Sequence, residues 1–325
     1  MPRVLITGAA GFIGMHTAIR FLKEGWDVIG LDNVNDYYSV QLKKDRLSEI
    51  QKAADEYQKN FIFFKSDLNS NVWNELEEFD FNSVVHLAAQ AGVRYSIQNP
   101  MAYLESNILG FQRVIDFVLK KNINRFLYAS SSSVYGKNSN QPFSEEEACN
   151  SPESYYAATK KANEMMAHSY SKTHGIKSIG LRFFTVYGPW GRPDMAPMLF
   201  AHAAHNNSEI DVYNHGKQKR DFTYIDDIVE GIYRLVKLEH QERDFMLCNI
   251  GNGSPVDLLE FISKIESYFQ FKLTKNFLPA QNGDVEVTYC DTSYLTKIVG
   301  YQPKHNLESG IKLFIQWFRK YYDYN

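Results

Sequence analysis

The feature that most constrains the fold is an alternation of short apolar runs with longer segments of helical length over the first two thirds of the chain. The apolar runs are rich in β-branched residues and cover Val4–Ile6, Asp27–Leu31, Phe61–Lys65, Ser83–Leu87, Arg125–Ser130 and Ser178–Phe184. Strands that alternate with helices build βαβ units, in which the strands are parallel and helices cover both faces of the sheet. The sequence therefore predicts an α/β fold with a Rossmann-type, doubly wound parallel sheet.

The chain after about residue 186 follows a less regular pattern, which predicts a second domain. It begins with a loop rich in Pro and Gly, GPWGRPDMAP, and continues with short strands and with helices expected at Ile225–Leu238, Leu258–Tyr268 and Leu307–Tyr321. We expect residues 1–185 to form the sheet domain, with segments of about 215–255 returning to it. Residues 186–325 should form mainly a smaller α/β cap that binds the substrate.

Composition and charge exclude several classes of protein. The chain has 325 residues, of which 44% are hydrophobic and 22% charged, and its net charge of -3 gives no reason to expect nucleic acid or an anionic membrane as a partner. No window reaches the roughly 20 apolar residues of a membrane span, and the N-terminus lacks the pattern of a signal peptide. Cys149, Cys248 and Cys290 show no CxxC spacing, which favours reduced thiols in a cytoplasmic protein and predicts no metal site.

Three glycines follow the first expected strand, where the next helix begins. Gly8, Gly11 and Gly14 form GxxGxxG, a spacing that lets the backbone approach a pyrophosphate beside the free N–H groups of the helix. Such small residues also serve close packing of a helix on a strand. Asp32, at the end of the second strand, favours the dinucleotide interpretation, because a carboxylate there binds both ribose hydroxyls of an adenosine. Since no Arg or Lys is adjacent in the sequence to neutralise a 2′-phosphate, NAD is preferred over NADP.

Further cofactor contacts are expected where other strands end, because an open α/β sheet binds its ligand at the carboxyl ends of its strands. For Asp67, loop capping is an equally good interpretation. The residues predicted to bind the cofactor are Gly8, Gly11, Phe12, Ile13, Gly14, Asp32, Asn33, Asp67, Leu68, Leu87, Ala88, Ala89, Tyr156 and Lys160.

Tyr156 and Lys160 are the candidate chemical centre. They are four residues apart in ESYYAATKKANE, which places both side chains on one face of a helix. A phenol with a pKa near 10 is a poor base at neutral pH, but an adjacent ammonium group and a positive nicotinamide ring favour the phenolate. Such a pair could deprotonate an alcohol, although YxxxK pairs also occur by chance on helix surfaces.

Together with these motifs, the segments LDNVNDYY, AAQAGVRYS, SSSSVYG, YAATKKA, LRFFTVYGPWGRPDM and RDFTYIDDIV resemble the extended short-chain dehydrogenase/reductases, specifically the nucleotide-sugar epimerases that act on UDP-glucuronate at C4. The resemblance implies that Tyr156 takes the proton from the sugar O4 while a hydride passes from C4 to NAD. Lys160 would lower the pKa of Tyr156 and bind the nicotinamide ribose. The 4-keto sugar would then rotate and take the hydride back on its other face, which yields UDP-galacturonate.

The serine run SSSSVYG acquires distinct roles from this resemblance. Ser131 falls where the family keeps the Ser or Thr that hydrogen-bonds O4, and Ser132 and Ser133 stand where related dehydratases and decarboxylases place acids. A 4-keto glucuronate is a β-keto acid that can lose carbon dioxide, so an epimerase must fix its carboxylate. Ser132 and Ser133, with Thr185 and Arg192, could do so. Turn formation for the hydroxyl residues and surface charge for Arg192 are the alternatives.

The resemblance also implies contacts to the rest of the nucleotide sugar. Arg220 matches the family position that contacts the diphosphate, and Asp284 resembles a residue near the uridine ribose. Arg94 is a possible substrate contact, and a salt bridge at a helix start is an equally good interpretation.

Two other functions stay open at this point. The same fold could act on neutral UDP-hexoses such as UDP-glucose or UDP-N-acetylglucosamine, or the chain could be a non-catalytic NAD-binding regulator. The family also implies a homodimer formed by helices at about 99–120 and 153–174, and a role in supplying precursors for polysaccharide biosynthesis.

Overall fold

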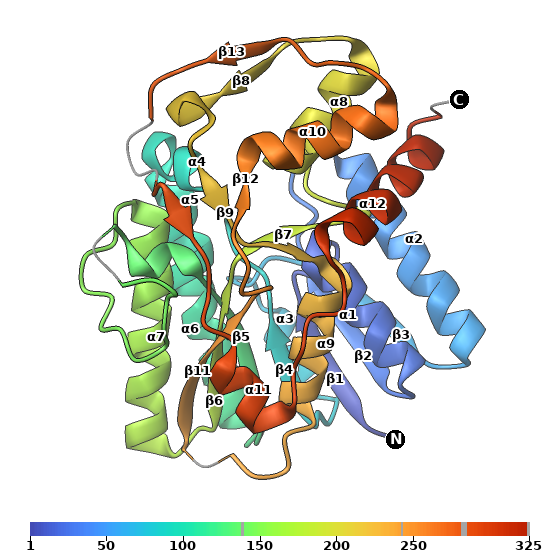
Figure 1. The fold of residues 1–325 in the computed structure, drawn as a ribbon. Coiled ribbons are helices and arrows are strands. Elements are labelled where there is room, and N and C mark those ends of the chain that lie inside the picture. Colours follow the sequence, from blue (N-terminus) through green and yellow to red (C-terminus); the bar gives the residue numbers. More distant parts are fainter. Residues whose placement is uncertain (138–139, 242, 281–284, 324–325) are drawn as a thin grey trace.

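A parallel sheet forms the centre of the molecule in the computed structural model, which describes residues 1–137, 140–241, 243–280 and 285–323. All pairings between its seven strands are parallel, and the strand order is β11-β6-β5-β4-β1-β2-β3 (Figure 1). The strands are β1 (Arg3–Thr7), β2 (Asp27–Asp32), β3 (Phe61–Lys65), β4 (Ser83–His86), β5 (Phe126–Ser131), β6 (Ser178–Phe183) and β11 (Phe245–Ile250). This arrangement confirms the predicted Rossmann-type fold.

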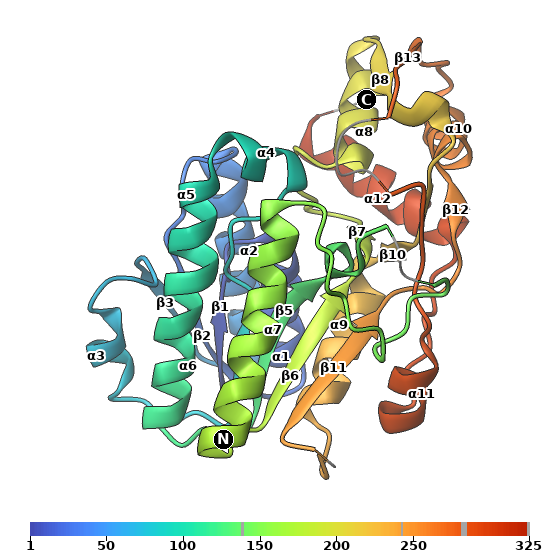
Figure 2. The same cartoon turned by 90° about the vertical axis from the view of Figure 1, so that its left-hand side faces the viewer.

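Helices cover both faces of the sheet (Figure 2). One face carries α1 (Phe12–Lys23), α2 (Val40–Tyr57) and α9 (Ile225–Val236), and the other carries α3 (Val72–Leu76), α6 (Gly110–Lys120) and α7 (Tyr155–His174). Strand β1 shows why both faces are filled: Val4 and Ile6 belong to the apolar cluster of α1 and α9, whereas Leu5 belongs to that of α6. Alternate side chains point to opposite faces of a strand, so a strand buried on both faces is apolar throughout.

The long helix expected over 99–120 contains a π-helical turn. It runs as α5 (Pro100–Tyr103), the π-helix η1 (Leu104–Leu109) and α6, and it is preceded by α4 (Val93–Gln98). A π turn inserts an extra residue into the helix, and such insertions are frequent at functional sites. Within this turn, the buried side chain is that of Asn107.

The cap lies over the carboxyl ends of the central strands (Figure 1). Its three small sheets are β7-β10, β12-β9-β14 and β8-β13. The remaining elements are η2 (Ser132–Tyr135), β7 (Thr185–Tyr187), α8 (Ala196–Asn206), β8 (Ile210–Val212), η3 (Tyr213–Gly216), β9 (Lys219–Arg220), β10 (Phe222–Tyr224), β12 (Val256–Asp257), α10 (Leu258–Phe269), β13 (Lys275–Phe277), β14 (Val287–Thr288), α11 (Ser293–Val299) and α12 (Leu307–Tyr321).

The chain leaves the cap, adds two elements to the large sheet and then returns to the cap. After α8 and the small strands, α9 packs against α1 and β11 pairs with β6, so two elements from the second half of the chain lie on the large sheet. These elements fall within the segment of about 215–255. The division into domains at residue 185 stays a proposal.

Among the residues that the structure describes, no helix has the length and apolar character needed to cross a membrane.

Candidate active site

A cavity of about 410 Å³ opens between the sheet and the cap. Its lining includes every residue predicted to bind the cofactor or to take part in the chemistry. Of the residues predicted to bind the substrate, it includes Ser132, Ser133, Thr185 and Arg192. The carboxyl ends of neighbouring parallel strands meet at one edge of a sheet, so residues far apart in the sequence converge there.

The glycine segment brings backbone close to the floor of this cavity. Gly8 has a φ of +74°, and a Cβ atom built on it would lie 2.6 Å from the backbone nitrogen of Ala88. A Cβ on Gly14 would lie 2.0 Å from the carbonyl oxygen of Gly8. Gly11 is the N-cap of α1 and provides no side-chain cap, which leaves the first N–H groups of the helix for an anion. Packing and phosphate binding are thus both served by these glycines, and the cradle fits a dinucleotide.

Asp32 is the last residue of β2 and lines the cavity. Its carboxylate accepts hydrogen bonds from the backbone N–H groups of Ala10, at 3.1 Å, and Val34, at 2.8 Å. Burial raises the pKa of Asp32, while the Val34 hydrogen bond and the charge of Lys43 act in the opposite direction. Nearby, Asn33 donates to Asp67 at 2.9 Å, so these two loops are tied together.

Lys43 is a lining residue that the sequence analysis missed. It reaches the cavity from α2, and its Nζ donates to the carbonyl oxygen of Asn35 at 2.7 Å and to the side-chain oxygen of the same residue at 2.6 Å. Burial lowers the pKa of Lys43 and the charge of Asp32 raises it. No Arg or Lys is adjacent to Asp32 in the sequence. The fold supplies one from a helix further on, and no local pattern marks it.

The catalytic candidates Ser131, Tyr156 and Lys160 all line the cavity. Lys160 donates from Nζ to the carbonyl oxygen of Ala129 at 2.8 Å, and burial lowers its pKa to about 7. Burial raises the pKa of the Tyr156 phenol, while a hydrogen bond with Ser131 and the positive charge of Arg192 lower it. The expected effect of Lys160 on the pKa of Tyr156 stays a prediction. The groups that lower this pKa in the structure are the hydroxyl of Ser131 and the guanidinium of Arg192.

The residues of the serine run have different contacts: Ser130 binds a buried carboxylate, and Ser132 and Ser133 line the cavity. Ser130, in β5, donates to Glu164 at 2.7 Å, and the same carboxylate makes two bonds to Arg182, at 2.8 and 2.9 Å. Ser131 ends the strand, and its Oγ accepts from the backbone N–H of Ser133 at 3.1 Å. The chain then turns through η2, which places Ser132 and Ser133 on the cavity wall.

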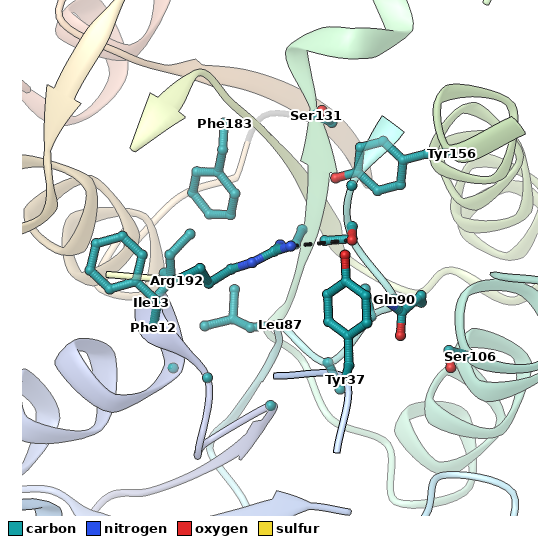
Figure 3. A pocket seen from close by; sticks show the side chains of 18 of the residues that line it. Phe12, Ile13, Tyr37, Leu87, Gln90, Ser106, Ser131, Tyr156, Phe183 and Arg192 are labelled. Atoms are coloured by element: carbon teal, nitrogen blue, oxygen red, sulfur yellow. Dashed lines mark hydrogen bonds between the residues drawn. The ribbon is translucent and has the colours of Figure 1, made fainter. Parts of the chain in front are cut away.

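Arg192 projects into the cavity from the loop after β7 (Figure 3). Figure 3 shows its side chain extending toward the side where Tyr37 and Tyr156 lie. Its Nη2 donates to Asp194 at 2.6 Å and to the carbonyl oxygen of Ala91 at 3.3 Å, and its Nε donates to Asp194 at 3.1 Å. Burial would lower the pKa of Arg192, but the charge of Asp194 and the bonds to it outweigh burial and raise it.

Arg94 and Arg220 lie outside the lining. The guanidinium of Arg94 stacks on the ring of Tyr213 at 4.5 Å, so α4 contacts the cap through this pair. Arg220 donates to the carbonyl oxygens of Lys219 and Glu286, at 3.0 Å each. Asp284 lies outside the described residues.

Asn107 supports the site from behind and also escaped the sequence analysis. Its amide group accepts from the N–H of Gln90 at 2.8 Å, donates to the oxygen of Gln90 at 3.0 Å, and donates to Thr159 at 3.0 Å. Asn163 in turn donates to the carbonyl oxygen of Asn107 at 2.6 Å. The π turn thereby fixes both the Gln90 segment of the cavity wall and α7, which carries the Tyr156 and Lys160 pair. A single Asn inside a helix gives no sequence signal for this role.

Residues 4–251 match the model of the NAD dependent epimerase/dehydratase family. The chain belongs to this family. A cradle of glycines before a helix, a carboxylate at the end of β2 and a Tyr and Lys pair on α7 all fit a family of NAD-dependent enzymes.

Known relatives can be aligned with nearly the whole length of this chain. It is 47% identical to protein CapI of Staphylococcus aureus over 98% of this chain and 99% of that one. It is 39% identical to a probable UDP-glucuronate 4-epimerase of Rhizobium meliloti, with 98% of each chain covered. Among solved structures, the UDP-glucuronic acid 4-epimerase of Bacillus cereus in complex with UDP-glucuronic acid and NAD is 31% identical with a TM-score of 0.90, over 98% of this chain and 100% of that chain.

Proposed function

We propose that this protein epimerises UDP-glucuronate at C4 to UDP-galacturonate without loss of carbon dioxide. The observation that carries the proposal is the position of Arg192, a guanidinium in the same cavity as Ser131, Tyr156 and Lys160. It is close enough for its charge to act on the pKa of Tyr156. A cation beside the reacting groups suits a sugar that carries a carboxylate one carbon beyond its ring. Relatives described as UDP-glucuronate 4-epimerases support the same substrate.

The proton steps belong to side chains of this protein. Tyr156 takes the proton of the O4 hydroxyl and later returns it, and Ser131 hydrogen-bonds the same oxygen. Lys160, held by the carbonyl oxygen of Ala129, supplies positive charge beneath the reacting centre. When NAD is bound, it supplies the reversible oxidation at C4.

In this proposal, the carboxylate of the sugar is held by side chains that line the cavity. Ser132 and Ser133 offer hydroxyl groups from η2, Thr185 offers one from β7, and Arg192 offers charge-assisted hydrogen bonds. A β-keto acid loses carbon dioxide when its carboxylate bond aligns with the carbonyl π system. Fixing the carboxylate away from that alignment keeps the sugar acid intact.

Arg94, Arg220 and Asp284 stay proposed contacts for the nucleotide end of the substrate. Arg94 already bridges from α4 to Tyr213 of the cap, and Arg220 lies on a cap strand. Both side chains would have to exchange some of their present contacts for the diphosphate.

The test is to incubate purified protein with UDP-glucuronate and to follow the sugar by NMR. We expect UDP-galacturonate to form, with no UDP-pentose and no carbon dioxide. Conversion of UDP-glucose but not of UDP-glucuronate would overturn the substrate. If neither sugar is converted, the protein is better described as a non-catalytic NAD-binding regulator.

A neutral UDP-hexose is the second candidate substrate. It is favoured by the pairing of Arg192 with Asp194, since the charge of the guanidinium is already compensated inside the protein. A neutral sugar could therefore occupy the cavity without leaving an unpaired cation.

We also propose a homodimer. Large apolar side chains are exposed on α4, α5, η1 and the start and middle of α7, and they are Ile97, Met101, Leu109, Tyr155 and Met165. An apolar surface of this kind on neighbouring helices suits burial against a second copy.

A further inference from the structure

The carboxylate of Asp194 binds only one edge of the Arg192 guanidinium. The bonds to Asp194 use Nε and Nη2, and the bond to Ala91 uses Nη2 again. A guanidinium presents its five N–H groups in a rigid planar fork, so a carboxylate bound to the Nε edge fixes the direction of the opposite end. These three bonds do not use Nη1, which therefore stays available for a second carboxylate.

Asp194 is itself held by a side chain from another segment. The hydroxyl of Tyr37, from the segment between β2 and α2, donates to the Oδ2 atom of Asp194 at 3.2 Å. The rings of Tyr37 and Tyr95 are in contact, with their centroids 4.8 Å apart. Tyr37, Asp194 and Arg192 thus form a chain of three hydrogen-bonded side chains, of which Tyr37 and Arg192 line the cavity.

The backbone of the loop does not depend on Asp194. Arg46, which is fully buried in α2, donates to the carbonyl oxygens of Trp190 at 2.7 Å and Gly191 at 3.2 Å. It also donates to the carbonyl oxygen of Ala10 at 3.0 Å. Arg46 therefore secures the loop just before Arg192, and what remains for Asp194 is the orientation of the Arg192 side chain.

We propose that Asp194, held by Tyr37, is a positioning residue that orients Arg192 so that its Nη1 end fixes the substrate carboxylate away from the geometry of decarboxylation. The inference rests on the proposed function, because it concerns the acid group of UDP-glucuronate. In the unwanted reaction the C5–C6 bond of the 4-keto acid breaks, its electron pair moves to C5 and onto O4 as an enolate, and carbon dioxide leaves. C5 then takes a proton from water.

The experiment measures the product ratio with UDP-glucuronate labelled at C6. We expect Asp194→Ala to release carbon dioxide in a fraction of turnovers at least ~10-fold larger than wild type, since the bidentate, charge-assisted restraint on Arg192 is lost. Asp194→Asn keeps an acceptor for one N–H and should stay within about 3-fold of wild type, and Tyr37→Phe should lie between the two. Asp36→Ala, which removes an exposed carboxylate from the segment that carries Tyr37, is the matched control and should leave the ratio unchanged.

A double-mutant cycle separates positioning from a structural role. If Asp194 acts through Arg192, then Asp194→Ala adds nothing to the carbon dioxide fraction of Arg192→Ala. A purely structural role would instead weaken UDP binding, measured by calorimetry, without changing the product ratio. Wild-type protein that converts UDP-glucuronate while Asp194→Ala gives the wild-type ratio overturns this inference alone. Wild-type protein that does not convert UDP-glucuronate overturns the proposed function, and the inference falls with it.

Discussion

At the residue scale, the proposed chemistry depends on one phenol oxygen. Replacing Tyr156 by Phe keeps the ring but removes the group that takes the proton from O4, so we expect kcat for UDP-glucuronate to fall by roughly 10²–10⁴-fold, the usual contribution of a general base. Conversion is measured by NMR and NAD retention by absorbance of the released cofactor. Tyr155→Phe, at the exposed neighbouring position, is the control and should retain activity. Full activity of Tyr156→Phe would remove Tyr156 from the mechanism.

The buried Lys160 should make the free energy of unfolding depend on pH. Burial lowers its pKa to about 7, whereas in an unfolded chain the pKa is about 10.4. Between these values the unfolded chain binds a proton that the folded chain has released, so the penalty for burying this lysine is full below about pH 7 and fades as the pH rises toward 10. Lys160→Met should therefore stabilise the NAD-free protein, on the order of a few kcal/mol near pH 7 and by much less near pH 9.

The measurement is denaturant unfolding of the NAD-free variant and wild type across this pH range. Lys172→Met, on the exposed face of the same helix, is the control and should show no such trend. A stability difference between Lys160→Met and wild type that does not depend on pH would contradict the assignment of the shift to burial.

The residues of the site differ in how visible they are in the sequence. Tyr156 and Lys160 could be predicted because one helical spacing brings them together, and Gly8 to Gly14 because one turn does. Tyr37 and Lys43 could not, since each gains its role from a partner on a different loop or helix. Asp194 is only two residues from Arg192, but their contact depends on how the loop after β7 folds. Arg94 and Arg220 were assigned from a resemblance, and their side chains contact Tyr213 and backbone carbonyls in this structure.

At the element scale, the π turn is expected to hold α7 in register with the cavity wall. Asn107→Ala removes the hydrogen bonds to Gln90 and Thr159 and leaves buried polar groups without partners, which costs about 1–3 kcal/mol for each such group. We expect a lower midpoint of unfolding and a lower kcat, because Tyr156 shifts with α7. Arg113→Ala, at an exposed position of α6, provides the comparison. An Asn107→Ala protein that is as stable and as active as wild type would mean that the turn is only a packing feature.

The large and small sheets differ in how far they can be predicted. The six strands expected from apolar runs were found within one or two residues of their bounds. Five of them are buried along nearly their whole length, and the more exposed β3 still carries an apolar run, FIFFK. The small sheets of the cap have strands of only two or three residues, such as β9 and β12. Such short pairings depend on tertiary contacts, and too few residues take part for a pattern to appear.

At the scale of the whole molecule, the proposed homodimer predicts which surface matters. Met165 on α7 is 48% exposed, so Met165→Glu places a charge in an interface that would bury it. We expect the variant to be monomeric in light scattering coupled to size exclusion, with an unchanged circular dichroism spectrum. Leu313→Glu, at a 39% exposed position on α12, should leave the assembly intact. Equal mass for both variants and wild type would place the interface elsewhere.

The strand β11 has a consequence for how the molecule is made. Its partner β6 is buried along its whole length, and the pairing begins only at Phe245. A ribosome therefore has to release the chain beyond Ile250 before that edge of the sheet can be covered. Until then the growing chain carries an unpaired apolar strand, the kind of surface that pairs with other chains or is shielded by chaperones during synthesis.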